Sequence, residues 1–118
     1  MKDIKYRLEI LSKIYRTAYQ LGKATKITRY TTSRILSGKS KGSKTTHQRI
    51  NKLYSFLSRR YYFQPLIKVV HRGEPTGEWV TGRIVLLENL EDEANRMIEV
   101  LQQSDGDGEW GDTRRFKQ

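Results

Sequence analysis

The chain has 118 residues, of which 36% are hydrophobic and 31% charged, and its formal net charge is +10. It contains no cysteine, which excludes a disulfide framework and thiolate metal sites, and no apolar run of about 18 residues, which excludes a membrane-spanning helix. Its first residues lack the uninterrupted apolar stretch of a secretory signal, so we expect a soluble cytoplasmic protein.

The first quarter of the chain is predicted to form two helices. Apolar side chains recur at a spacing near that of an α-helix over residues 3–15, at Ile4, Leu8, Leu11 and Ile14. A second helix is predicted over residues 16–26, because the Thr17 side chain can cap its first turn. Ala18, Leu21 and Gly22 are expected to face inward in this helix.

Two further helices are predicted before residue 60. Thr28 can cap a helix that runs to Ser37, and Gly38 can close it in the left-handed conformation. A basic loop over 39–44 follows. Thr45 or Thr46 is expected to cap the next helix, whose apolar stripe consists of Ile50, Leu53, Tyr54 and Leu57.

The second half begins with a predicted β-hairpin. Pro65 is expected to stop the preceding helix, and the apolar, β-branched residues 66–70 predict a strand. The turn signal at 72–78 and a second apolar run at 79–87 complete an antiparallel pair. Gly82, inside the second run, indicates a bulge or a close contact.

A last helix and a tail are predicted after the hairpin. Asn89 is expected to cap a helix with an acidic first turn and an apolar face over residues 90–101. Residues 104–118 are expected to be a mobile acidic tail that Trp110 and Phe116 could pin down.

Charge divides the chain into a basic half and an acidic half. Residues 1–62 hold 16 Lys and Arg against 2 Asp and Glu, a net charge of +14. Residues 63–118 have a net charge of −4, and the segment 88–112 holds 9 acidic residues with Arg96 as its one basic residue. A basic half of this kind favours polyanion binding over a merely solvated surface, because such a charge repels itself without counter-charge.

Residues 17–38, TAYQLGKATKITRYTTSRILSG, carry a recognisable pattern. Leu and a small residue are followed after four residues by Ile-Thr, and then by Thr-x-Ser-Arg-x-Leu-x-Gly. The chain resembles the phage-repressor (Cro/XRE-like) helix-turn-helix family over about residues 3–58. It departs from the family's usual residues at Lys26 (usually glycine), Thr32 (usually Val or Ile) and Gly22 (usually alanine).

The resemblance implies a DNA reader whose second motif helix lies in the major groove. It places Arg29, Tyr30, Ser33 and Arg34 against base edges, where each arginine suits guanine. Phosphate contacts would come from Thr17, Thr28, Ser37, Lys39, Lys41 and Lys44. The implied function is sequence-specific regulation of transcription, with repression at an inverted-repeat operator, and the implied partners are double-stranded DNA and a second copy of the chain.

The predicted fold class is therefore α+β, with an N-terminal four-helix helix-turn-helix bundle followed by a β-hairpin and a C-terminal helix. We expect a DNA-binding domain over 1–62, a hairpin and acidic helix over 63–103 that serve dimerisation or partner binding, and the tail over 104–118. The main alternative is a phage-encoded inhibitor of an RNA-guided nuclease (anti-CRISPR), in which residues 88–112 bind a basic protein. RNA binding through the basic loop and the tyrosines is a third possibility.

Nothing in the sequence predicts an enzyme, a cofactor or a metal site. His47 and His71 lie far apart in the chain and in different predicted segments. Residues 105–112 resemble a calcium loop, but Trp110 stands where the loop needs glycine and Phe116 where it needs glutamate. The aromatic cluster at 59–63 is interpreted as core rather than as a base-stacking surface.

Overall fold

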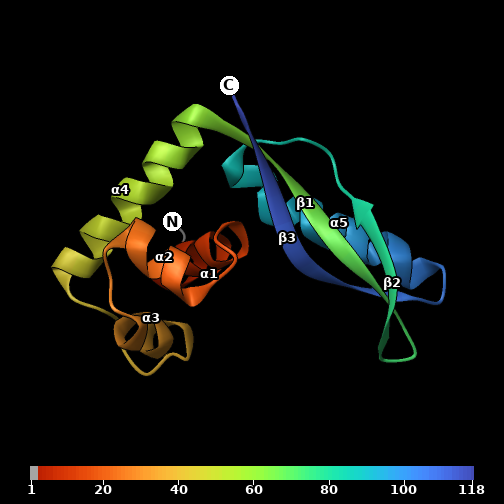
Figure 1. Cartoon of the computed structure of the whole chain (residues 1–118), viewed down its shortest axis with the longest axis horizontal. Coiled ribbons are helices and arrows are strands. Elements are labelled where there is room, and N and C mark those ends of the chain that lie inside the picture. The colour runs from red at the N-terminus through yellow and green to blue at the C-terminus, as the bar shows by residue number, and fades with distance from the viewer. Residues whose placement is uncertain (1–2) are drawn as a thin grey trace. The chain divides into compact units, whose positions relative to one another are not determined.

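The computed structural model describes residues 3–118 and confirms an α+β chain. The part described contains five α-helices and a three-stranded antiparallel sheet (Figure 1). In chain order the elements are α1 (Ile4–Ile14), α2 (Ala18–Thr25), α3 (Arg29–Leu36), α4 (Lys44–Arg60), β1 (Tyr61–His71), β2 (Glu74–Thr81), the 3-10 helix η1 (Leu87–Asn89), α5 (Leu90–Gln103) and β3 (Asp107–Lys117). No helix among these is long and apolar enough to cross a membrane.

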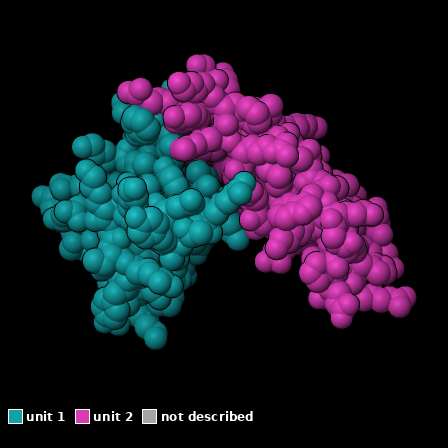
Figure 2. Space-filling view, viewed as in Figure 1, with its two compact units in different colours: residues 1–59 teal, residues 60–118 magenta. Residues whose placement is uncertain are grey.

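The chain forms two compact units, shown in different colours in Figure 2. The first ends at Arg59 and the second spans Arg60–Gln118. The prediction placed the boundary after residue 62, and residues 104–118, predicted as a tail, lie in the second unit.

Side-chain caps set the beginnings of the helices in the first unit. Thr17 accepts a hydrogen bond from the backbone N–H of Gln20, and Thr28 accepts one from that of Thr31, so both predicted caps are confirmed. The cap predicted at Thr45 or Thr46 is wrong. The hydroxyl of Ser43 accepts from the N–H of Thr46, which lets α4 begin at Lys44.

The core of the first unit is built from aliphatic residues of all four helices. Ile27 is buried in the connection between α2 and α3. Ala18, expected to face inward, is exposed, because it is the first residue of α2. The other buried apolar residues are Leu8, Ile10, Leu11, Leu21, Ile35, Ile50 and Leu57.

In the second unit, α5 packs on one face of a sheet with strand order β2-β1-β3 (Figure 1). Gly108 on β3 lies so close to this helix that an added Cβ would be 2.8 Å from Leu101 and 2.7 Å from Ile67 on β1. The buried apolar residues of this unit are Phe63, Ile67, Leu87, Leu90, Ala94 and Trp110. The apolar periodicity of 66–70 and 90–101 is thus used within the unit itself.

The predicted hairpin is correct in type but wrong in its bounds. β1 begins at Tyr61, and Pro65 lies inside it instead of stopping a helix. The Pro65 carbonyl accepts a hydrogen bond from the N–H of Gly82. The alternate residues Phe63, Pro65 and Ile67 are buried. β2 ends at Thr81 instead of 87, and beyond it the isolated bridge between Phe63 and Val85 extends the pairing.

The residues next to α5 include one close backbone contact and one helix start without a side-chain cap. Gly82 does mark a close contact, since an added Cβ would lie 2.8 Å from Pro65 and 2.9 Å from a Glu93 carboxylate oxygen. Asn89 occupies the N-cap position of α5, but its side chain makes no capping hydrogen bond, because η1 leads directly into the helix.

The expected mobile tail is the third strand. β3 pairs antiparallel with β1 over most of its length, from Tyr61 opposite Lys117 to Val70 opposite Asp107. Trp110 and Thr113 are buried. The indole N–H of Trp110 donates to the Thr113 hydroxyl at 3.0 Å, so this half of the prediction, that Trp110 anchors the segment, is correct.

Candidate nucleic-acid interface

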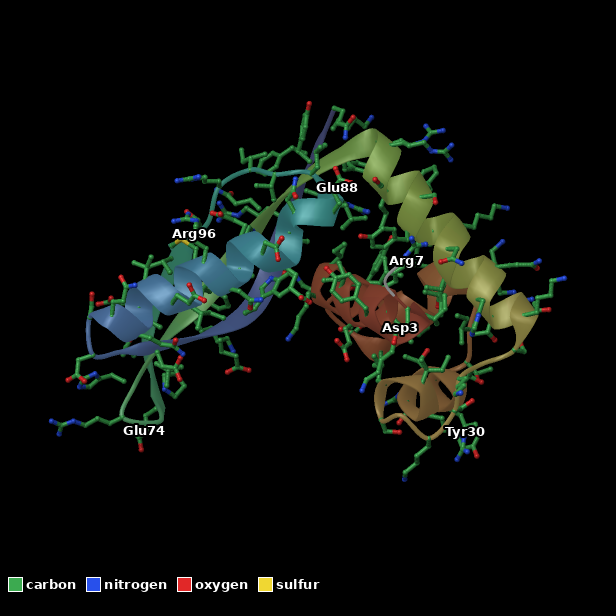
Figure 3. All side chains as sticks on the ribbon, turned by 180° about the vertical axis from the view of Figure 1, so that it is seen from behind. Asp3, Arg7, Tyr30, Glu74, Glu88 and Arg96 are labelled. Atoms are coloured by element: carbon green, nitrogen blue, oxygen red, sulfur yellow. The ribbon has the colours of Figure 1, made fainter. Side chains whose placement is uncertain are left out.

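Helix α3 has one buried face and one polar, exposed face. Thr32 and Ile35 are buried. The predicted base-reading residues Arg29, Tyr30 and Ser33 are exposed, while Arg34 is half-buried. These residues stand at i, i+1, i+4 and i+5, which is a single face of a helix. Tyr30 is 71% exposed, and Figure 3 shows it at the outer side of α3.

The connection between α2 and α3 is short and includes a left-handed residue. Lys26 has φ 60° and ψ 32°, the conformation for which glycine is usual. Two contacts hold this turn: the Lys26 N–H donates to the Gly22 carbonyl at 2.8 Å, and the Arg49 guanidinium donates to the Lys26 carbonyl at 2.8 Å. An added Cβ on Gly22 would lie 3.2 Å from the Ile27 carbonyl oxygen, so a small residue suits this position.

Four of the ten predicted contact residues line a common hollow. Its volume is about 600 Å³, and it lies among the end of α1, the start of α2 and the side of α3 that carries Arg29 and Ser33. The four are Thr17, Arg29, Ser33 and Ser37. Arg16, which the sequence analysis did not select, lines it as well. The position of Arg16 directly before the helix cap Thr17 is the sequence signal that could have identified it.

Arg34 is already engaged within the first unit. Its guanidinium carbon lies 5.6 Å from the centre of the Tyr30 ring, and its Nη2 donates to the Lys39 carbonyl at 3.3 Å. These contacts connect α3 to the basic loop and orient Tyr30. Arg34 is therefore a bridging residue in this structure, whereas Arg29 and Ser33 have no such contact with the loop.

The remaining predicted phosphate contacts lie outside the hollow. The side chains of Lys39, Lys41 and Lys44 are exposed, and each belongs to the loop before α4 or to its first residue. A backbone contact fixes this loop against α4, because the His47 ring donates a hydrogen bond to the Lys41 carbonyl. Thr28 is exposed, and its hydroxyl is used in capping α3.

The first unit carries further cations that sequence reasoning did not assign. Arg49, Lys52 and Arg59 are exposed on α4 and line a second hollow of about 710 Å³ with the end of α2. This hollow shares no lining residue with the one beside α3. The basic charge of this unit is therefore spread over more than one surface.

One acidic residue of the predicted partner-binding segment 88–112 is internal. Glu93 is 6% exposed, and its carboxylate accepts from the Arg83 N–H at 2.6 Å and from Arg96 at 2.8 and 2.7 Å. The hydrogen bond from Arg96 lowers the pKa of Glu93, and the Arg83 N–H adds to this effect, while burial opposes it. Glu93 thus stabilises the second unit and is not free for a basic partner, whereas Glu88, Asp92 and Glu99 are exposed.

No family model, no curated protein and no solved structure matches this chain.

Proposed function

We propose that the chain is a sequence-specific DNA-binding regulator of transcription in which α2, the turn at Lys26 and α3 act as a helix-turn-helix. In this proposal α3 enters the major groove, and its exposed face reads base edges. The observation that carries the proposal is the division of α3 into a face buried through Thr32 and Ile35 and an exposed face of Arg29, Tyr30 and Ser33.

Charge supports a nucleic-acid partner for this unit. Residues 1–62 have a net charge of +14, which attracts a phosphate backbone and makes binding salt-dependent. The hollow beside α3 adds a defined place for one phosphate group, because it places the Arg16 side chain beside the hydroxyl groups of Thr17 and Ser37. The amino end of α2, which Thr17 caps, favours negative charge as well.

Arg29 is the residue that best tests base reading. Arg34 also bonds the Lys39 carbonyl, so its replacement would disturb the loop and the helix together. Arg29 is exposed at the first position of α3, and it makes no hydrogen bond to the loop. A guanidinium there can donate two hydrogen bonds to guanine O6 and N7.

The test begins with selection of the preferred duplex from random DNA, followed by anisotropy titrations on the selected and on a scrambled duplex. Arg29→Ala should weaken binding to the selected duplex by about 1–3 kcal/mol and binding to the scrambled duplex much less. Lys41→Ala should weaken both similarly and flatten the salt dependence.

Lys52→Ala is the matched control, because it removes the same charge from the second hollow on α4. It should change the selectivity between the two duplexes little. Equal losses on both duplexes for Arg29→Ala would contradict base reading by α3, and failure to select any preferred duplex would contradict sequence-specific binding altogether.

A further inference from the structure

Strand β3 has a free edge. It pairs with β1 along one side, and no other strand of the described chain pairs with its opposite side. The strand is 11 residues long, which leaves a row of backbone groups directed away from the sheet. An edge of this length is a template for pairing with another strand.

Two backbone N–H groups on this edge are occupied by local side chains. The N–H of Gly108 donates to the Asp107 carboxylate at 2.8 Å, and the N–H of Thr113 donates to the Asp112 carboxylate at 2.8 Å. These bonds can be exchanged for ladder bonds to a carbonyl of an incoming strand. The exchange would release both carboxylates for contact with basic side chains on that strand.

The charges of β3 are sorted along its length. Its first six residues contain Asp107, Glu109 and Asp112, and its last five contain Arg114, Arg115 and Lys117. On the neighbouring strand β1, the residues opposite Arg114 and Lys117 are Gln64 and Tyr61, neither of which is acidic. The pairing of β3 with β1 therefore places no acidic residue directly opposite these two basic side chains.

A second copy of the same strand would place acidic side chains beside Arg114 and Lys117. When two β3 strands pair antiparallel about a two-fold axis, the acidic half of each lies beside the basic half of the other. Parallel pairing would place like charges together along the whole edge, which is unfavourable. The order of charges thus favours one occupant and one direction for the free edge.

We propose that β3 is a homodimer interface, at which two copies join their sheets edge to edge through antiparallel β3 strands. Within 63–103, the range first expected to serve dimerisation, Phe63, Ile67 and Leu90 are buried in the unit itself, while Trp79, Ile84, Leu86 and Val100 remain exposed. This interface is independent of the proposed DNA contacts, because it uses only residues 107–117 of the second unit.

The test exchanges charge between the two halves of the edge in the full-length chain. One variant carries Arg114→Glu and Lys117→Glu, and the other carries Asp107→Lys and Glu109→Lys. All four side chains are exposed, so each variant should fold, which circular dichroism verifies. In sedimentation equilibrium, the parent chain should be a dimer of 13.9 kDa subunits. Each variant alone should dissociate about tenfold to a hundredfold more readily.

Mixing the two variants in equal amounts should restore a dimer as stable as that of the parent, because their edges are again complementary. The control variant carries Asp92→Lys and Glu99→Lys on the exposed side of α5, where a comparable change of charge should leave dissociation unchanged. A parent chain that remains monomeric at the highest concentration reached would overturn the proposal. Variants that dimerise alone as well as the parent would overturn it too. Both results are independent of whether the chain binds DNA.

Discussion

Two buried threonines in adjacent helices are expected to respond oppositely to the same substitution. Thr32 on α3 is 9% exposed, and its hydroxyl has no hydrogen-bond partner among the described residues. Thr25 on α2 is 2% exposed, and its hydroxyl donates to the Leu21 carbonyl at 2.8 Å and accepts from the Ile27 N–H at 3.3 Å. Valine has nearly the same shape as threonine, so Thr→Val isolates the effect of the hydroxyl.

The magnitudes follow from what each hydroxyl contacts. A buried polar group without a partner costs about 1–3 kcal/mol, and replacing it with a methyl group removes that cost. Thr32→Val should therefore raise the free energy of unfolding of the first unit by about 1–2 kcal/mol. Thr25→Val should lower it by about 1–3 kcal/mol, because the buried Ile27 N–H loses its acceptor.

Urea unfolding followed by circular dichroism at helical wavelengths measures both changes. In thermal unfolding, a gain of about 1 kcal/mol in a unit of this size should raise the midpoint by about 4–8 °C. If Thr32→Val destabilises the protein, the hydroxyl has a partner or the site does not accept a methyl group. If Thr25→Val has no effect, the two hydrogen bonds of Thr25 do not contribute to stability, and the reasoning fails for both positions.

Two more predictions concern the turn and the buried carboxylate. Lys26→Gly should raise the free energy of unfolding by about 0.5–1 kcal/mol, because glycine takes the left-handed conformation without strain, whereas Lys23→Gly within α2 should lower it by a similar amount in the same urea titration. Glu93→Gln should cost about 1.5–3 kcal/mol at neutral pH, since it weakens the bonds from Arg96 and the Arg83 N–H. The folded-state pKa of Glu93 is lowered from 4.5, so its contribution is present above that value and is lost as pH falls through the folded pKa. The difference in free energy of unfolding between the parent and Glu93→Gln should thus shrink below about pH 4.5. The control Glu99→Gln, at an exposed position, should change the free energy of unfolding little at neutral or at acid pH. A difference for Glu93→Gln that stays constant down to acid pH would contradict this account.

The sequence alone predicted correctly those features that depend on a few neighbouring residues. Thr17 and Thr28 cap helices because a hydroxyl and the N–H three residues later are both supplied by one short segment. The left-handed conformation of Gly38 was predicted on the same local basis. The contact between Arg34 and the Lys39 carbonyl was not predictable in this way, since it depends on the path of the loop.

The third strand was missed because its pattern is not the simple alternation of a strand. Its register shifts between Leu66 and Ile67 on β1, which face Asp112 and Trp110, so Gly111 is the extra residue of a bulge. As a result the buried residues Trp110 and Thr113 are three positions apart instead of two. Charged residues at the exposed positions of an edge strand then made the segment look like a solvated tail.

The pairing of β3 with β1 also determines when each unit can form during synthesis. The first unit is built from helices whose stabilising contacts are complete once α4 has left the ribosome. β1 is made next, but it pairs on one side with a strand that is translated more than 35 residues later, from Asp107 onward. Until then the nascent chain holds a half-built sheet that lacks Trp110 from its core. Folding on the ribosome should therefore proceed in two separate steps, the second of which waits until β3 has been translated.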